Sequence, residues 1–299
     1  MLEVRVTPSG AFDNEARRYQ HIEARPIAAA MGAEIAGADV RSLTDEAFAE
    51  FCDALYHHKM IFVRDQELSH ADHARFTRRF GNFGTDAYTK GVEDFPDVQP
   101  VIKEADARTK AIFGGSWHTD SAFLERPPSI STLYSVEIPP FGGDTAWANT
   151  VLAYRILSPA MQAMLAPLRV HMSAEGNFTT QVRLNGTAIP FSSEGAREQA
   201  FSGSFHPLVR THPVSGEKAL YVDESYAVGI EGMTEAESRP ILAFLATHIT
   251  QHAFTCRLRW EPSMLVLWDN RICLHHASND YDGYRREMYR TTVQGEVPA

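Results

Sequence analysis

The chain has 299 residues, of which 44% are apolar and 22% charged, so it is long enough to bury a large core without disulfide or metal support. Its 28 basic and 38 acidic residues give a formal net charge of −10, which argues against a nucleic-acid partner and requires any anion site to be local. No apolar stretch is long enough for a membrane span or a signal peptide, so no membrane association is expected. Three scattered cysteines form neither a disulfide framework nor a zinc pattern, which favours a cytoplasmic location.

Two segments are distinguished along the chain. Residues 1–21 are polar and weakly patterned, and we expect an N-terminal extension there. Residues 22–299 show neither internal repeats nor a low-complexity linker, which indicates a single domain.

Helix signals are clear in several places. Thr44 is expected to cap a helix that runs to about His58, and Ser69 to open a second helix that ends near Gly81. Further helix starts are expected at Asn149, at Ser158-Pro159 and at Thr234, where Glu237 completes a capping box.

Short β-rich segments lie between these helices and do not alternate regularly with them, so a doubly wound parallel sheet is disfavoured. The pattern predicts a mixed α/β protein with a β core, a double-stranded β-helix (jelly roll) with helices packed on the outside. The expected strands are Met60–Arg64, Ser131–Ile138, Ala219–Val222, Thr255–Trp260, Leu265–Trp268 and Tyr289–Val293.

The segment Trp117-His118-Thr119-Asp120-Ser121 carries a candidate metal site. In an extended strand, His118 and Asp120 would point to the same side, and a third histidine would complete a two-His-one-carboxylate face for a divalent metal. Such a pair also occurs by chance, and His118 could instead be a hydrogen-bonded core residue.

A second informative segment runs from Trp260 to Val293. A buried strand leads into the pair His275-His276, and the spacing alone does not decide between them, because neighbours on a strand face opposite sides. Arginines follow at 285, 286 and 290, and an arginine can hold the far carboxylate of a metal-bound dicarboxylate with two parallel hydrogen bonds.

From about Ile22 to Gly295 the chain resembles the TauD/TfdA family of Fe(II)/2-oxoglutarate-dependent dioxygenases. Each matching motif is modest alone, but six of them occur in the order found in the family. They are Gly32-Ala33-Glu34-Ile35-x-Gly37-x-Asp39, WHTD at 117–120, GGDT at 142–145, HPLVRTHPVSG at 206–216, LWDNR at 267–271, and the His and Arg pattern of 275–290.

The resemblance implies a set of site residues. It selects His118, Asp120 and His275 as iron ligands, and Thr145 and Arg286 as the groups that bind the distal carboxylate of 2-oxoglutarate. For the substrate it implies Arg290, Ser121, Phe178 and Tyr226. Without the resemblance, Thr145 would be interpreted as a turn residue, Arg290 as a surface arginine, and Phe178 and Tyr226 as core residues.

The resemblance also implies the reaction. Fe(II), 2-oxoglutarate and O₂ would act together to give succinate and CO₂ while a substrate C–H bond is hydroxylated, with no catalytic side chain beyond the metal centre. His206 and His212 each precede a proline, which favours extended backbone, and we expect them to be structural.

The expected substrate is a small-to-medium organic anion of the aryloxyalkanoate, alkyl sulfate or sulfonate class, with C–O or C–S cleavage where the hydroxylated carbon carries oxygen or sulfur. A taurine-type activity is the first alternative, but residues 84–88 lack a histidine, and Gly114 replaces an asparagine that taurine dioxygenase uses. A zinc hydrolase and a catalytically silent jelly-roll binding protein are further alternatives. A homo-oligomer is compatible with the sequence.

Overall fold

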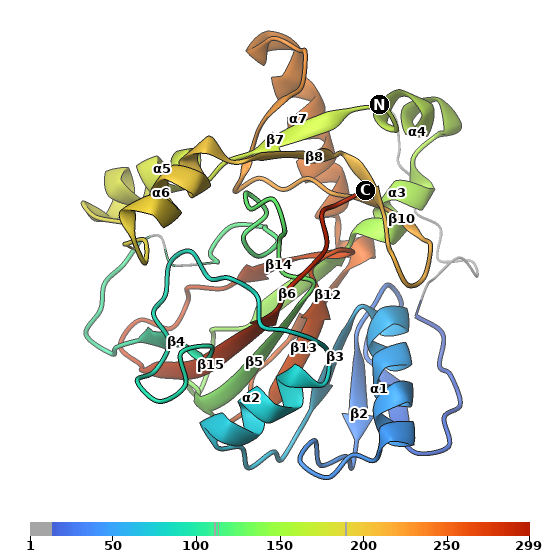
Figure 1. Cartoon of the computed structure of the whole chain (residues 1–299), viewed down its shortest axis with the longest axis vertical. Helices are drawn as coiled ribbons and strands as arrows, with labels where there is room; N and C mark the ends of the chain where they lie inside the picture. The colour runs from blue at the N-terminus through green and yellow to red at the C-terminus, as the bar shows by residue number, and fades with distance from the viewer. Residues whose placement is uncertain (1–13, 111, 113, 189) are drawn as a thin grey trace.

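The computed structural model describes residues 14–110, 112, 114–188 and 190–299. Its largest sheet has seven strands in the order β1-β2-β3-β13-β5-β15-β4, and all neighbours are antiparallel except β2 and β3 (Figure 1). These strands are β1 (Glu23–Pro26), β2 (Ala33–Ala36), β3 (Met60–Val63), β4 (Gln99–Lys103), β5 (Ile130–Glu137), β13 (Leu265–Asp269) and β15 (Arg286–Val293).

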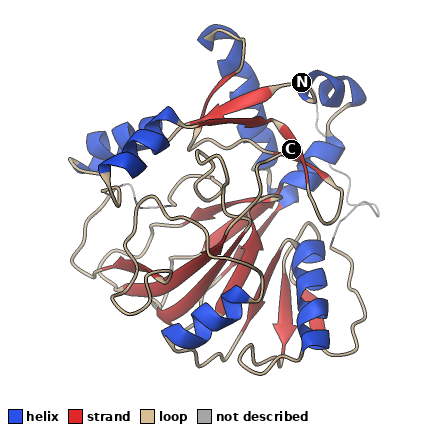
Figure 2. Ribbon diagram, in the orientation of Figure 1, coloured by secondary structure: helices blue, strands red, loops and turns tan. Residues whose placement is uncertain are grey.

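Smaller sheets complete the β structure (Figure 2). One has the order β12-β6-β14, another β11-β7-β8, and β10 pairs with β9. Their bounds are β6 (Thr145–Asn149), β7 (Arg169–Met172), β8 (Ser204–Pro207), β9 (Val209–Thr211), β10 (Lys218–Leu220), β11 (Ala227–Ile230), β12 (Thr255–Leu258) and β14 (Cys273–Ala277).

A sandwich core lies between the seven-stranded sheet and the β12-β6-β14 sheet. Alternate residues of β13 explain it: Val266 and Trp268 pack against Trp147 of β6, whereas Leu265 and Leu267 belong to the cluster beneath the helices. The sheets therefore face each other in the expected jelly-roll arrangement, with helices outside it.

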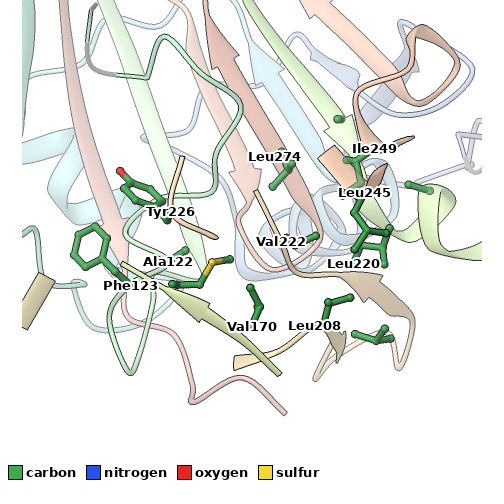
Figure 3. Packing of buried hydrophobic residues seen from close by; sticks show 14 of the residues in the cluster. Ala122, Phe123, Val170, Leu208, Leu220, Val222, Tyr226, Leu245, Ile249 and Leu274 are labelled. Carbon is green, nitrogen blue, oxygen red and sulfur yellow. The ribbon is translucent and has the colours of Figure 1, made fainter. Parts of the chain in front are cut away.

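Four of the helices cover the outer faces of the sandwich. The side chains of α1 and α2 pack on the seven-stranded sheet, while α3 and α7 belong to a separate apolar cluster that includes Leu274 of β14 (Figure 3). Bounds are α1 (Asp45–His58), α2 (His70–Arg78), α3 (Thr150–Ile156), α4 (Pro159–Leu165), α5 (Glu175–Asn185), α6 (Glu194–Ser202), α7 (Glu235–Ile249) and a 3₁₀ turn (His252–Phe254). Within the described ranges, no helix is both long and apolar enough to cross a membrane.

The expected helix starts are confirmed. Thr44, Ser69, Asn149 and Ser158 are N-caps whose side chains accept backbone N–H bonds, and the Thr234 capping box is present. The first helix runs to His58 as expected, whereas the second ends at Arg78, three residues before Gly81.

Several expectations about extended segments need correction. The strand expected at Ala219–Val222 is β10, which ends at Leu220, and the strand expected at Thr255–Trp260 is β12, which ends at Leu258. The strand expected at Tyr289–Val293 begins earlier, at Arg286. Trp117–Ser121 is not a strand: His118 forms a single β-bridge with His275, and Asp120 lies in a turn. The reason is that Ser121 has the left-handed φ of 45°, which ends the extended backbone directly after Asp120.

The first 13 residues of the expected N-terminal extension lie outside the described residues. From Asn14 onward the chain contacts α1, where Arg17 and Tyr19 both bind the carboxylate of Asp53. Asn14 itself is buried and bonded to His58.

Candidate metal centre

His118, Asp120 and His275 form a buried cluster in which one ligand atom of each residue lies within 4.8 Å of the others. The Nε2 atoms of His118 and His275 lie 4.0 and 3.9 Å from Oδ1 of Asp120. Two imidazole nitrogens and a carboxylate oxygen converging at this spacing suit one divalent metal ion, because such an ion draws its ligands to about 2 Å from itself.

Backbone pairing holds the two histidines together. His118 N–H donates to the carbonyl of His275 at 3.0 Å, and His275 N–H donates back at 2.8 Å. The ring centroids are 4.0 Å apart as a result. The Nδ1 of His118 donates to the Ser116 carbonyl, which leaves Nε2 as the nitrogen that carries the lone pair.

Strand alternation decides between the adjacent histidines of β14. Cys273 belongs to the sandwich core, and His275 and Ala277, which follow at steps of two, line the interior cavity. His276 points the other way, toward the ring of Trp117. The geometry therefore brings His275 to the cluster and keeps His276 out of it.

Asp120 is oriented by neighbours that the sequence did not point out. Its Oδ2 accepts from the hydroxyl of Ser131 on β5, and that hydroxyl in turn accepts from Asn270 Nδ2 at 2.8 Å. Thr119 donates to the Asn270 carbonyl at 2.7 Å. Asn270 lies in the LWDNR motif, but the sequence did not indicate that it helps to orient Asp120. Ser131 gives no sequence signal beyond its place in a strand.

Burial and charge set the protonation of the cluster. Burial lowers the pKa of His118, and burial together with His118 holds the pKa of His275 well below its usual value. Burial alone would raise the pKa of Asp120, but Arg290 and the two histidines outweigh it and lower that pKa to about 2. Neutral imidazoles beside an ionised carboxylate are the forms that bind a cation.

A cavity of about 610 Å³ opens beside the cluster. His118 and His275 line it, and so do Thr145, Arg286 and Arg290. Arg286 and Arg290 both reach it because they are four residues apart on β15, on the face that also carries the core residue Met288.

Arg286 is buried on the wall of this cavity. Its side chain is 6% exposed, and its Nε and Nη2 atoms have no hydrogen-bond partner among the described residues. Burial lowers its pKa, and its guanidinium lies 5.6 Å from the ring centre of Trp260. Trp260 also donates to the hydroxyl of Thr145 at 2.9 Å, which fixes that hydroxyl on the same wall. Buried donors without partners fit the far carboxylate of a bound dicarboxylate.

Arg290 is buried rather than superficial. Its Nη1 donates to Asp120 Oδ1 at 2.9 Å, and its Nη2 donates to Asp86 Oδ2. Burial opposes the charge, but the two carboxylates outweigh burial and raise the pKa of Arg290. The sequence did not point out Asp86, which lies in the loop between α2 and β4.

The remaining expected substrate residues do not line this cavity. Tyr226 packs on Phe123 in the apolar cluster that Figure 3 shows, and Phe178 stacks with Phe191. Ser121 is buried next to Asp120. Both aromatic residues therefore have packing partners, and Tyr226 also lies 6.4 Å, between ring centres, from His118. A role for them in substrate binding stays a prediction.

The two proline-linked histidines have structural partners, as expected. His206 Nε2 lies 2.9 Å from the carbonyl of Ala122, and His212 Nε2 lies 3.0 Å from Asp269 Oδ2. Neither belongs to the metal-ligand cluster.

A jelly-roll sandwich with two histidines and one carboxylate beside an open cavity defines the class of mononuclear non-haem iron dioxygenases. Within that class, the chain belongs to the TauD/TfdA family: residues 23–292 match the family model described as taurine catabolism dioxygenase TauD, TfdA family.

Characterised relatives extend over nearly the whole chain. This chain is 33% identical to an alpha-ketoglutarate-dependent sulfate ester dioxygenase of Pseudomonas putida, and the alignment covers 93% of this chain and 91% of the relative. It is 32% identical to the alpha-ketoglutarate-dependent 2,4-dichlorophenoxyacetate dioxygenase of Cupriavidus pinatubonensis, covering 91% and 97%.

Solved structures share the fold. A taurine dioxygenase from Burkholderia xenovorans superposes with a TM-score of 0.78 at 33% identity, covering 94% of this chain and 93% of the other. AAD-2 in complex with Mn(II) and N-oxalylglycine gives a TM-score of 0.75 at 27% identity, covering 93% and 98%. The expected jelly-roll fold is confirmed.

Proposed function

We propose that the protein is an Fe(II)- and 2-oxoglutarate-dependent dioxygenase that oxidises a small-to-medium organic anion. The observation that carries the proposal is the pairing of a buried two-His-one-carboxylate cluster with the buried Arg286, whose Nε and Nη2 have no partner among the described residues, both on one cavity. When bound, the iron would supply the activation of O₂ that couples decarboxylation of 2-oxoglutarate to oxidation of a substrate C–H bond.

Each residue then has a role. His118, Asp120 and His275 would hold the iron, and Arg286 with Thr145 would bind the far carboxylate of 2-oxoglutarate. Ser131 and Asn270 keep the Asp120 carboxylate oriented. The protein contributes orientation and exclusion of water, and no side chain needs to act as general acid or base.

The substrate class follows from Arg290 and from the apolar walls of the cavity. Arg290 would face the anionic head group, and the apolar lining leaves room for a larger body. Sulfate esters, sulfonates and aryloxyalkanoates are the candidates, since relatives are named for acting on such compounds. We also propose a cytoplasmic location, which the three free cysteines support.

The test has two parts. Anaerobic addition of Fe(II) and 2-oxoglutarate should give a weak visible charge-transfer band, and succinate should form with O₂ in the presence of members of an anion panel. A zinc hydrolase would work without O₂ and 2-oxoglutarate, and a silent binding protein would form no succinate. Absence of stimulated succinate formation with every sulfate, sulfonate and carboxylate would overturn the proposal.

A further inference from the structure

Asp86 makes an unexpected contact inside the site. Its carboxylate is 5% exposed and accepts from Nη2 of Arg290, which is 6% exposed. The same guanidinium donates through Nη1 to Asp120 at 2.9 Å. One buried positive charge therefore faces two negative charges before any substrate is present.

The loop itself holds Asp86 in this place. Its Oδ1 accepts from the backbone N–H groups of Tyr88 and Thr89 at 2.8 and 2.7 Å, so only Oδ2 is directed at Arg290. Tyr88 anchors the loop by packing on Phe123 and Phe191. The carboxylate is thus fixed by two contacts that do not depend on Arg290.

The charge balance has a direct consequence for an anionic ligand. Asp120 would be committed to the metal, so Asp86 is the carboxylate that competes with a substrate head group for Arg290. Buried like charges at short distance repel strongly because little water screens them. An anion at this point gains less from Arg290 than it would beside an arginine with no carboxylate partner.

We infer that Asp86 is a specificity-determining residue that weakens the binding of fully anionic head groups at Arg290. The ratio of the affinity for an anion to the affinity for its neutral isostere is therefore smaller than it would be without Asp86. Binding then depends more on the apolar body of the substrate. This apolar body would contact the apolar side chains that line the cavity: Val101, Ile112, Leu133, Ala188, Pro190 and Trp268. This inference rests on the proposed function, because it concerns the substrate of the same site.

The variant Asp86→Asn separates the two kinds of contact that Asp86 makes, with the loop amides and with Arg290. The amide oxygen still accepts from Tyr88 and Thr89, while the amide nitrogen that replaces Oδ2 cannot accept from Arg290. Asp86→Ser is the second variant, since a hydroxyl still accepts from the loop amides but is too short to reach Arg290. Glu137→Gln is the matched control: it removes one carboxylate from an exposed pair with Arg285.

The experiment measures binding without turnover. Protein loaded with Mn(II) and N-oxalylglycine is titrated calorimetrically with hexanesulfonate and its neutral isostere hexanesulfonamide, and with hexanoate and hexanamide. For Asp86→Asn and Asp86→Ser we expect anion affinity to rise roughly tenfold, the size of one charged hydrogen bond, with the neutral partners unchanged. Glu137→Gln should match the wild type.

The outcomes are distinct. The inference is overturned if the ratio of the affinities for the anionic and the neutral probe is equal in the wild type and in both Asp86 variants. It is also overturned if the loaded protein binds none of the four probes. Failure to bind Mn(II) and N-oxalylglycine would instead refute the proposed function itself, and the inference with it.

Discussion

His275 and His276 are adjacent on β14, but the strand directs their rings to opposite faces. His275→Ala should abolish the anaerobic Fe(II)–2-oxoglutarate absorption band, because two ligands remain at a site that needs three. His276→Ala should keep the band at near wild-type iron affinity, because its ring lies against Trp117. The reverse result would move the third ligand by one residue.

Arg286 and its neighbour Arg285 allow a similar comparison. Arg286→Gln should weaken 2-oxoglutarate binding by roughly 10- to 100-fold, since two charge-assisted hydrogen bonds to the far carboxylate are lost. Arg285→Gln should change it little, because Arg285 pairs with Glu104, Glu137 and Glu287 at the surface.

The concentration of 2-oxoglutarate that gives half-maximal succinate formation provides the measurement. Equal values for the two variants would show that Arg286 does not bind the cosubstrate. Iron binding in the absence of 2-oxoglutarate should be the same in both, which separates loss of the cosubstrate contact from loss of the metal.

At this scale the sequence predicted residues whose chemistry is visible in a motif. His118, Asp120 and Arg286 fall in recognisable patterns, and all three lie on the site. Asp86 and Ser131 could not be found in that way, because they act through contacts between segments that only the fold brings together.

At the scale of elements, α2 supports the strand that carries both arginines. Its capping box joins Ser69 and Asp72, and its residue Thr77 bonds to Thr291 of β15 at 2.7 Å. Ser69→Ala should lower the free energy of unfolding by about 1 kcal/mol, the usual value of a side-chain cap. The affinity for 2-oxoglutarate should stay unchanged, because the cap lies on the outside of the sheet.

Urea unfolding measures this effect, and Ser69→Asp serves as the control because aspartate also caps helices well. A loss of stability in Ser69→Asp equal to that in Ser69→Ala would show that the cap is not the cause. A large change in 2-oxoglutarate affinity would mean that α2 positions β15 more directly than its packing suggests.

A capping signal made several helix starts predictable, although the start of α6 after the N-cap Ser193 was not expected. The helices that begin after Thr44, Ser69 and Thr234 follow side-chain caps that can be seen in the sequence. Helix α5 begins at Glu175 after Ala174, an N-cap residue that makes no side-chain cap hydrogen bond, so its start carries no such signal. The strands of the smaller sheets are only three to five residues long and depend on tertiary pairing.

For the whole molecule, buried histidines should control the response to acid. Burial lowers the pKa of His58 and His73 to about 3 and that of His206 to about 4, whereas the value in the unfolded chain is about 6.5. The unfolded state then binds more protons below pH 6.5, so these residues' contribution is intact above that pH and is lost as the pH falls.

The protonation of Asp223 changes the folding stability in the opposite direction. Burial raises its pKa to about 7, so the folded state holds its proton and gains stability as the pH falls from 7 toward 4. Three histidines outweigh one carboxyl group, and the net stability should decrease between pH 7.5 and pH 5.5.

His73→Gln should reduce that loss by about 1 kcal/mol, because one shifted group accounts for up to roughly 1.4 kcal/mol per pH unit. Urea unfolding of the metal-free protein at the two pH values provides the measurement, with His21→Gln, an exposed histidine, as the control. The expectation fails if His73→Gln loses as much stability as the wild type.

The β-bridge between His118 and His275 also bears on how the protein acquires its ion. Two main-chain hydrogen bonds place the two rings side by side, so folding itself does the work of bringing distant parts of the chain together. A chelator should therefore strip the ion and leave a folded protein with its binding site still assembled. Ions could then be exchanged without refolding, and which metal the enzyme carries would depend on the supply in its surroundings.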